Sequence, residues 1–532
     1  MLVSLLYILA CAKPVPPAPA PVDTRFTILS INDTYRIEGR EESGAGGMAR
    51  VRTLRRRLEA EGPVLVLHAG DLLYPSLLSR TYDGAQMIDL LGWLDGDPDA
   101  FDPLLFATFG NHEFDRRGME DAALLQQRIA ESDFTWVNSN VRFVEEGGRP
   151  VIEAGNLVPT ALVEIAGAKV GIIGICGDFT SADYIDGYAD PVATARAQAA
   201  ALRRAGAHLV VALTHLDVAD DLALLDTLGD AGPDLVVGGH DHVHMLRQAS
   251  NGRQVVKADA DAVSAVVTSV RLDAGGAHIS PEIVSLDMAV APDPQVQARV
   301  DAWLRDHERS YCADHGEQAP CLDAVLGRTA VRLEAEEAAI RSRETSLGDW
   351  VADLALRHFA DQGAQVAFLN SGGLRIDKDI PAGTALTRRH LDELLPYPTK
   401  LRLVRIDGAT LQAVVEQATD GWPGSGNWLQ VAGMAFRHDT AANRVSDLHL
   451  LDADGSPVPL APDQPVLAVT SSFLLGGGDG YAMLEGAEVV AEGPDLRDLI
   501  VADLAAAGDV GVAPGPMGRI CQSGAPCLLD GG

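Results

Sequence analysis

Five short polar clusters in the first half of the sequence carry side chains that could bind metal ions. Each follows an apolar run: Asp33 in SINDTY, Asp71 in HAGD, Asn111 and His112 in GNHE, His215 in ALTH, and His240 and His242 in GGHDHVH. A single Asp or His after a strand is usually a helix cap, a turn former or a structural residue. The joint occurrence of all five is difficult to explain by capping, so it predicts a metal site.

Carboxylate, imidazole and amide oxygen ligands without thiolates suit manganese, zinc, iron or cobalt. A carboxylate shared by two such ions would hold them about 3.5 to 4 Å apart. Two ions at that separation lower the pKa of a water molecule between them and hold the oxygens of an in-line displacement at phosphorus. The clusters therefore predict two divalent metal ions as cofactors, and phosphoester hydrolysis by a metal-activated hydroxide as the reaction.

The third cluster, FGNHEFD at residues 109–115, adds groups that could assist this reaction. Asn111 is a neutral ligand, and His112 would point at the phosphate to stabilise charge or protonate the leaving alkoxide. Asp115, three residues later, would orient the imidazole and favour its protonated form. The alternative is that His112 only caps a short helix. We expect His112 and Asp115 to be the catalytic residues.

Buried strands must bring these clusters together. The runs FTILSIN, PVLVLHAGD, HLVVALTH and PDLVVGGHDH lack polar alternation, which is typical of strands covered on both faces. Helical stretches such as MARVRTLRRRLEAE lie between them. The pattern predicts an α/β layered domain over residues 24–290, and the polar clusters fall at strand ends, where open α/β sheets place their sites.

A chain of 532 residues is too long for one core. Residues 293–310 have helical spacing without an internal glycine and predict a linking helix within a 291–327 linker. A second α/β region follows at 328–515, with the helix ETSLGDWVADLALRHFA, the strand AQVAFLN, a glycine turn and strands near 401, 431 and 465. A cysteine-containing tail, 516–532, ends the chain.

The charge balance limits the class of partner. Lys and Arg number 42 against 75 Asp and Glu, a formal net charge of −33. This argues against binding to a nucleic-acid backbone. A small phosphate ester remains a possible ligand, because metal ions and a few arginines could concentrate positive charge locally.

The N-terminal residues 1–23 have the composition of a signal and a tether. MLVSLLYILAC is too short to span a bilayer. It resembles a bacterial lipoprotein signal with Cys11 as the lipid-bearing residue, although the positively charged start is missing. An ordinary signal remnant and a mis-assigned start codon are the alternatives. The proline-rich run that follows suits a stiff tether, so we expect a periplasmic or cell-surface protein that contacts the membrane only through the lipid on Cys11.

The other five cysteines form two close pairs and one single residue. Cys312 with Cys321, and Cys521 with Cys527, could close small loops in an oxidising compartment. Cys176 lies in the apolar run VGIIGIC, which favours a buried small hydrophobic residue.

The motifs GD, GNHEFD, TH, GGHDH, NSGGLR and GGGDGY occur in an order that resembles the bacterial and animal 5′-nucleotidases, from about Thr24 to Gly515. The resemblance implies a layered αββα calcineurin-like metallophosphoesterase domain followed by an α/β nucleotide-recognition domain. It implies that Asp71 bridges both ions, that Asn111, His215 and His240 complete one site, and that Asp33 and His242 serve the other. It also implies an active site shared by the domains and a hinge near residues 293–310.

The first motif departs from the family pattern. Family members commonly read Asp-x-His, whereas here Asp33 is followed by Thr34 and Tyr35. Tyrosine is a poor ligand for these ions at neutral pH unless it ionises. The position could be taken by His242, by water or by nothing, so the identity and affinity of the first ion stay open.

The resemblance also assigns residues of the second domain to the nucleotide. Trp428 and Phe473 match two aromatic residues that would sandwich the base. Asp479 matches an acid that would bind the ribose hydroxyls. Arg341, Asn370 and Arg375 match polar residues that would contact the nucleotide. The alternatives are core positions for the two aromatics and the solvated start of a helix for Arg341.

Together these features predict an exported dimetal phosphohydrolase that removes the 5′-phosphate from nucleotides. A cyclic-nucleotide phosphodiesterase, a nucleotide-sugar hydrolase and a less selective phosphatase are alternatives on the same fold. A non-catalytic nucleotide- or metal-binding surface lipoprotein is an alternative from a different class.

Overall fold

The computed structural model describes residues 22–40, 43–314, 316, 318–376, 378–515 and 517–530. The chain divides into two compact units, Met1–His307 and Glu308–Gly532. Cys11 and most of the expected signal and tether lie outside the described residues. Within the described part of the chain, every helix is too short or too polar to cross a membrane.

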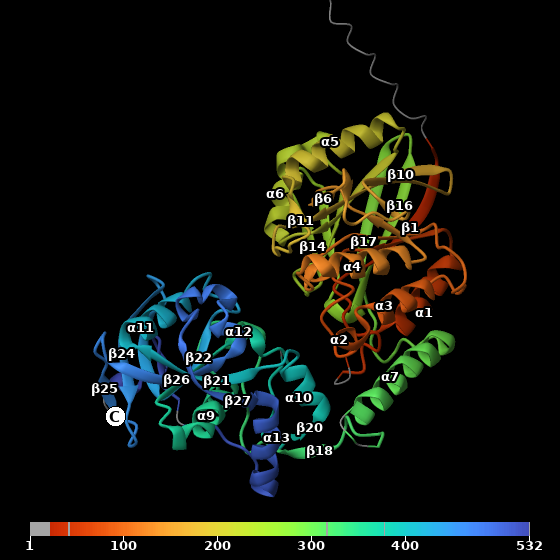
Figure 1. The fold of residues 1–532 in the computed structure, drawn as a ribbon. Helices are drawn as coiled ribbons and strands as arrows, with labels where there is room; N and C mark the ends of the chain where they lie inside the picture. Colours follow the sequence, from red (N-terminus) through yellow and green to blue (C-terminus); the bar gives the residue numbers. More distant parts are fainter. Residues whose placement is uncertain are drawn as a thin grey trace, which may run out of the picture. The chain divides into compact units, whose positions relative to one another are not determined.

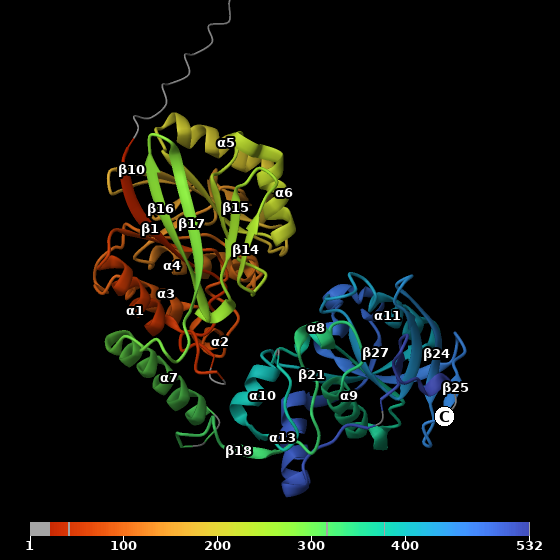
Figure 2. The same cartoon turned by 180° about the vertical axis from the view of Figure 1, so that it is seen from behind.

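Two mixed sheets form the centre of the first unit (Figure 1). One has seven strands in the order β17-β16-β1-β2-β3-β4-β8, and the other has six in the order β14-β15-β13-β12-β10-β9. Their bounds are β1 Thr24–Ile31, β2 Val64–His68, β3 Leu105–Ala107, β4 Thr135–Val137, β8 Leu157–Val158, β9 Thr160–Ile165, β10 Ala168–Cys176, β12 Leu209–His215, β13 Leu235–Gly238, β14 Met245–Gln248, β15 Gln254–Lys257, β16 Ser264–Asp273 and β17 Gly276–Ser285. The long β16–β17 hairpin, seen from behind in Figure 2, pairs with β1 through β16.

Apolar side chains fill the space between the two sheets, among them Ile28 of β1 and Ile172 of β10. Helices cover the outer faces. On the seven-stranded sheet lie α1 Met48–Glu59, α3 Ala85–Gly92, α4 Ala122–Ala130 and α7 Pro294–Asp314; on the six-stranded sheet lie α5 Pro191–Arg204 and α6 Val218–Leu228. This is the expected αββα arrangement. The short elements are α2 Ser79–Tyr82, β5 Val141–Phe143, β6 Glu145–Glu146, β7 Arg149–Pro150 and β11 Ile185–Tyr188.

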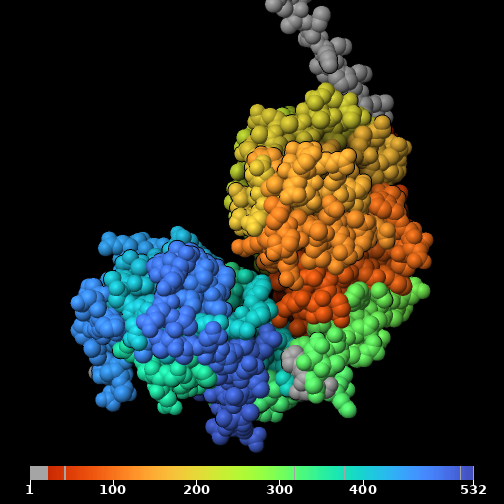
Figure 3. Space-filling model, in the orientation of Figure 1, coloured from red at the N-terminus to blue at the C-terminus, as the bar shows by residue number. Residues whose placement is uncertain are grey.

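The helix predicted over residues 293–310 is α7. Its side chains Val296 and Val300 join the core on the outer face of the seven-stranded sheet. Arg299 Nε and Trp303 Nε1 both donate to Asp89 of α3, at 2.6 Å each. Most of α7 is therefore fixed to the first unit, and its green surface lies beside the red-orange surface of that unit in Figure 3.

The second unit is also α/β, as expected. Its five-stranded sheet has the order β22-β19-β26-β21-β27, and a four-stranded sheet has the order β25-β24-β23-β28. The strand bounds are β18 Val325–Arg328, β19 Val366–Asn370, β20 Ala385–Thr387, β21 Lys400–Asp407, β22 Leu429–Ala432, β23 Met434–Asp439, β24 Arg444–Leu451, β25 Pro457–Pro459, β26 Pro465–Ser471, β27 Glu488–Asp495 and β28 Ile520–Cys521. The strands predicted near 401, 431 and 465 are β21, β22 and β26.

Helices pack on both faces of the five-stranded sheet. Trp350 of α9 and Ile500 of α13 belong to the core on one face, and Leu411 and Val414 of α11 to the core on the other. The helices of this unit are α8 Glu337–Ile340, α9 Ser346–His358, α10 Arg388–Leu394, α11 Gly408–Gln417, α12 Ser472–Leu475 and α13 Leu496–Ala507.

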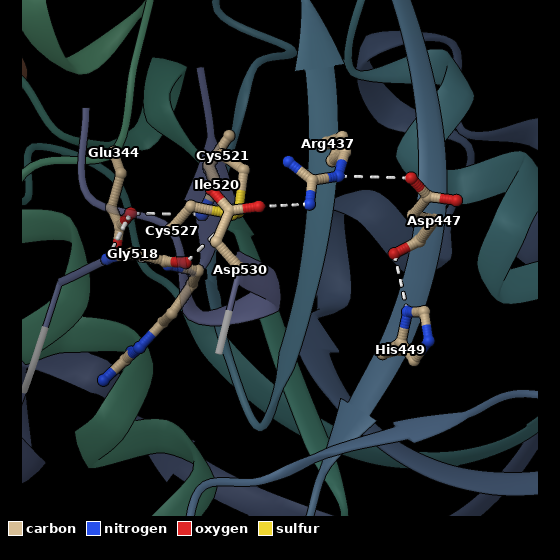
Figure 4. The surroundings of a disulfide bond; sticks show 10 residues. Glu344, Arg437, Asp447, His449, Gly518, Ile520, Cys521, Cys527 and Asp530 are labelled. Carbon is tan, nitrogen blue, oxygen red and sulfur yellow. Dashed lines mark hydrogen bonds and ion pairs between the residues drawn. A yellow bond between two sulfur atoms is a disulfide. The ribbon is translucent and has the colours of Figure 1, made fainter. Parts of the chain in front are cut away.

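The tail packs onto the second unit through β28, which pairs in parallel with β23 (Figure 4). The buried Glu344 carboxylate accepts hydrogen bonds from the backbone N–H groups of Gly518, Arg519 and Ile520. Cys521 and Cys527 form a disulfide. The other predicted pair, Cys312 and Cys321, is also bonded, and Cys176 is a free, buried cysteine as expected.

Candidate active site

The predicted metal ligands lie where the parallel strands end. Ile31 of β1 pairs with His68 of β2, so Asp33 and Asp71 follow neighbouring strand ends. In the second sheet β12 and β13 run parallel, and His215 is the last residue of β12. Because the carboxyl ends of parallel strands meet at one sheet edge, residues far apart in sequence converge there.

The first group of donors comprises Asp33, Asp71 and His242, whose ligand atoms all lie within 4.8 Å of one another. His242 Nε2 is 3.4 Å from Asp33 Oδ1. Both carboxylates are buried, whereas the imidazole is exposed. The group has the chemistry of a divalent metal site with oxygen-rich coordination.

The second group adjoins the first through Asp71. His215 Nε2 lies 3.2 Å from Asp71 Oδ2 and 3.9 Å from Asp33 Oδ1. His240 Nδ1 lies 3.2 Å from Asn111 Oδ1, and the rings of His215 and His240 are 5.2 Å apart at their centroids. The structure thus brings all six predicted ligands into one cluster.

His215 provides a test of whether this cluster fits a metal ion. Its Nδ1 lies 2.8 Å from the Ala69 carbonyl, which places a proton on Nδ1 and leaves Nε2 as the nitrogen that could bind a metal ion. Nε2 is buried and faces the carboxylate oxygens of Asp71 and Asp33. Burial by itself would lower the pKa of His215, but Asp71 and Asp33 raise it to about 10. The buried carboxylates of Asp33 and Asp71 thus favour a positive charge at this position, and a divalent ion would supply it.

Four of the predicted ligands adopt left-handed backbone conformations that L residues rarely take. The φ angles are 51° for Asp33, 58° for Asp71, 82° for His240 and 61° for His242. Such conformations cost free energy and persist where the surrounding structure enforces them, which is common at functional sites.

Glu113, inside GNHE, enforces part of this geometry, although the sequence motifs did not indicate a role for it. Its buried carboxylate accepts hydrogen bonds from the backbone N–H groups of Gly110 at 2.5 Å, Asp71 at 2.9 Å, Leu72 at 2.7 Å and Leu73 at 3.0 Å. It ties the loop after β2 to the loop after β3. No side-chain pattern signals this role, because the partners are backbone groups.

Lys257 holds the GGHDHVH loop in place, as Glu113 holds the loops after β2 and β3. The buried Nζ lies 2.5 Å from Asp241 Oδ2 and 2.9 Å from Asp221 Oδ2, and it donates to the Gly239 carbonyl at 2.8 Å. Asp241 stands between the two candidate ligands His240 and His242, so this ion pair fixes the loop that carries them. Phe179 also stacks on the His240 ring, with centroids 4.1 Å apart and planes 7° apart.

The side chains of His112 and Asp115, the two predicted catalytic residues, are in contact. His112 Nδ1 lies 3.0 Å from both carboxylate oxygens of Asp115. The His112 backbone N–H donates to Asp71 Oδ1 at 2.8 Å, which places the imidazole next to the cluster. The carboxylate favours a proton on Nδ1 and orients the ring.

Tyr35, at the position where the family pattern has histidine, reaches the first group. Its hydroxyl oxygen lies 3.3 Å from Asp33 Oδ1, 3.0 Å from Asp71 Oδ2 and 2.9 Å from His242 Nε2. Burial of the hydroxyl, with the charge of Asp71, raises the pKa of Tyr35 well above its usual value. In the absence of a cation the side chain is therefore a neutral hydrogen-bond donor.

In the second unit, three of the predicted substrate-binding residues lie together. Asn370 Nδ2 donates to Asp479 Oδ2 at 2.7 Å. Phe473 is 52% exposed, and its ring packs so closely over Gly478 that a Cβ there would lie 2.5 Å from ring carbons. Asp479 itself has a φ of 53°. An acid, an amide and an exposed aromatic ring therefore share one surface.

The two predicted arginines are held by neighbouring loops. Arg375 Nε donates to the Gly372 carbonyl at 2.8 Å. Arg341 Nη1 lies 2.8 Å from Glu337 Oε1 and 3.3 Å from the Gly424 carbonyl. The Gly372 N–H donates to the Gly426 carbonyl at 2.7 Å, which joins these two loops.

Trp428 requires a correction. The prediction placed its ring against a base, but the side chain is only 1% exposed. It packs beside His438, with ring centroids 5.1 Å apart, and its Nε1 donates to the Arg343 carbonyl at 3.2 Å. The ring is part of the core, the alternative considered for it, because NWLQV leads into the buried strand β22. Another exposed aromatic residue of this unit is Tyr397, at 46%.

An αββα unit with carboxylates and imidazoles at its strand ends defines a metallophosphoesterase, a hydrolase of phosphate esters. Family models agree with this class. Residues 26–244 match the calcineurin-like phosphoesterase model, and residues 325–486 match the model of the 5′-nucleotidase C-terminal domain. The chain belongs to the 5′-nucleotidase family, with both of its domains in the family's order.

Relatives match over nearly the whole chain. A snake venom 5′-nucleotidase of Naja atra is 27% identical over 90% of this chain and 95% of its own. The 5′-nucleotidase of Bos taurus is 25% identical over 92% of this chain and 89% of its own. The crystal structure of a 5′-nucleotidase precursor from Thermus thermophilus superposes with a TM-score of 0.77 at 25% identity, covering 94% of this chain and all of that one.

Proposed function

We propose that this hydrolase removes the 5′-phosphate from nucleotides outside the cytoplasm, using two divalent metal ions. The six candidate ligands are Asp33, Asp71, Asn111, His215, His240 and His242. The observation that carries the proposal is the buried Nε2 of His215, which lies against two buried carboxylates, 3.2 Å from Asp71 Oδ2 and 3.9 Å from Asp33 Oδ1. Such an arrangement is costly without a cation and favourable with one.

Divalent ions in this cluster would lower the pKa of a water molecule and neutralise the negative charge on phosphate. The remaining chemistry belongs to protein side chains. His112, oriented by Asp115 through Nδ1, would deliver a proton to the leaving alkoxide from its other ring nitrogen, Nε2. Glu113 and Lys257 would keep the ligand loops in place during the reaction.

The second unit would bind the nucleoside. Asp479 would accept hydrogen bonds from the ribose hydroxyls, Asn370 and the arginines Arg341 and Arg375 would contact the nucleotide, and Phe473 would stack on the base. These assignments follow the family resemblance, and the pairing of Asn370 with Asp479 supports them.

For the second aromatic partner we propose Tyr397 in place of Trp428. Strands β21 and β26 are antiparallel, with Leu401 opposite Ser471. Tyr397 precedes β21 and Phe473 follows β26, so both exposed rings lie at the same end of the sheet. Two rings at one sheet end could enclose a planar base, which the buried Trp428 could not do without leaving the core.

Phosphate release from AMP tests the proposed function. We expect the metal-loaded protein to release phosphate faster from AMP than from UDP-glucose, a cyclic nucleotide or an aryl phosphate. His112→Ala should lower kcat roughly 100- to 10,000-fold, because the leaving group then departs without a general acid. His278→Ala, in the exposed β17 strand, is the matched control and should leave kcat unchanged.

Two results would contradict the proposal. Nucleotide binding without phosphate release from any substrate would indicate a binding protein. Faster turnover of the cyclic nucleotide or the nucleotide sugar than of AMP would replace the 5′-nucleotidase activity by the corresponding alternative.

A further inference from the structure

Tyr35 occupies a position in the first donor group that the proposed function does not use. Its hydroxyl oxygen lies 2.9 to 3.3 Å from one atom each of Asp33, Asp71 and His242. Oxygen donors that share an ion at about 2.1 Å lie about 3 Å apart. The neutral hydroxyl oxygen therefore has the spacing of a fourth, weak donor beside the three ligand atoms.

The side chain is held in this position from several directions. The backbone N–H groups of Tyr35 and Arg36 both donate to Asp261 Oδ1, at 3.2 Å each. The Tyr35 ring makes edge contacts with His112 and His242, at centroid distances of 5.9 and 5.5 Å. Rotation of the hydroxyl away from the ligand atoms would disrupt these ring contacts.

The two donor groups consequently differ in chemistry. The first has two carboxylates, one hydroxyl and one imidazole, so three of its four side-chain donors are oxygens. The second has the shared Asp71, the amide oxygen of Asn111 and the imidazoles of His215 and His240. Imidazole ligands suit zinc, whereas oxygen-rich sites suit manganese and magnesium.

We propose that Tyr35 biases the first metal position toward manganese over zinc, while the second position keeps the zinc preference of an imidazole-rich site. The inference rests on the metal cluster of the proposed function and does not depend on which phosphate ester is hydrolysed. It assigns Tyr35 as the residue that determines metal selectivity.

The test is a competition between two metals in the full-length protein. Chelator-stripped protein is incubated with equal concentrations of Zn²⁺ and Mn²⁺ and desalted, and bound metals are counted by mass spectrometry and by Mn²⁺ electron paramagnetic resonance. We expect wild-type protein to retain both metals. In Tyr35→His, which restores the second imidazole, the bound zinc-to-manganese ratio should rise by about 10-fold or more.

Tyr35→Phe is the conservative companion variant, because it keeps the ring contacts and removes only the oxygen. It should lose manganese while its zinc count stays at the wild-type value. Unchanged zinc-to-manganese ratios in Tyr35→His, or wild-type manganese in Tyr35→Phe, would overturn the proposal.

Phosphate release from AMP is measured on the same samples, so the two hypotheses can fail separately. A shifted metal ratio without hydrolysis would refute the 5′-nucleotidase activity and leave the role of Tyr35 in place. Hydrolysis with identical metal ratios would refute the role of Tyr35 alone.

Discussion

Asp349, near the start of α9, is a buried carboxyl group outside the candidate metal cluster. Its burial and the neighbouring Glu344 raise its pKa to about 9, although Arg519 lies 3.5 Å away. The folded protein therefore keeps a proton on this group at pH values where the unfolded chain, with a pKa near 3.8, has lost it. Proton binding to the folded state stabilises it.

Stability should accordingly depend on pH through Asp349. The contribution is fully present below the unfolded pKa near 3.8 and is lost as pH rises through the folded value of about 9. We expect the melting temperature of the second unit to fall between pH 6 and pH 9, measured by calorimetry. Asp349→Asn, which mimics the protonated acid, should flatten this decrease, whereas Asp361→Asn at an exposed acid should not. Equal slopes in wild-type protein and Asp349→Asn would contradict the assignment.

The convergence of the candidate metal ligands could be predicted from the sequence because their signal is local. Asp71 and His215 each follow an apolar strand directly, and strand ends converge in α/β sheets. The loop-holding roles of Glu113 and Lys257 were not predicted, because their contacts depend on the tertiary structure. The base-stacking role predicted for Trp428 was wrong, because the local sequence beside a loop does not determine whether an aromatic ring faces a ligand or the core.

At the scale of elements, the C-terminal tail is a structural part of the second unit. Glu344 accepts hydrogen bonds from the N–H groups of Gly518 at 3.0 Å and Ile520 at 3.1 Å (Figure 4). It also accepts from the Arg519 N–H at 3.1 Å. Gln522 also donates to the Ser342 carbonyl at 2.9 Å. The tail thus fixes the segment that carries Arg341, one of the proposed substrate contacts.

Glu344→Gln should destabilise the second unit. The amide retains one acceptor but places an N–H₂ group against backbone N–H donors, and loss of charged hydrogen bonds costs about 1.5–3 kcal/mol. Urea unfolding measures this change as a lower midpoint. Glu416→Gln, on the exposed side of α11, is the matched control and should be neutral. A wild-type midpoint in Glu344→Gln would show that these hydrogen bonds contribute little.

The main elements were predictable because apolar runs and helical spacing are strong patterns. The β16–β17 hairpin was missed. Its outer strand, β17, is mostly exposed and pairs with β16, so it lacks the continuous apolar run that signals a strand covered on both faces. The order of β28 beside β23 also depends on a long-range pairing that local sequence does not encode.

At the scale of the whole molecule, the two disulfides are consistent with an extracytoplasmic location. We propose export with a lipid on Cys11, which lies outside the described residues. The full-length protein expressed in a bacterium should fractionate with membranes, and Cys11→Ser should move it to the periplasmic fraction. Ala12→Ser is the control and should stay with the membranes. Recovery of wild-type protein in the cytoplasm would contradict export.

In the proposed active site, side chains from five strand ends hold two divalent ions. Anomalous X-ray diffraction from metal-loaded crystals, collected at the manganese and zinc absorption edges, tests it most directly. We predict two peaks, one beside Asp33 and His242 and one beside Asn111, His215 and His240, with Asp71 between them. No peak at these side chains, or metal ions bound only elsewhere on the protein, would rule out the proposed two-metal site.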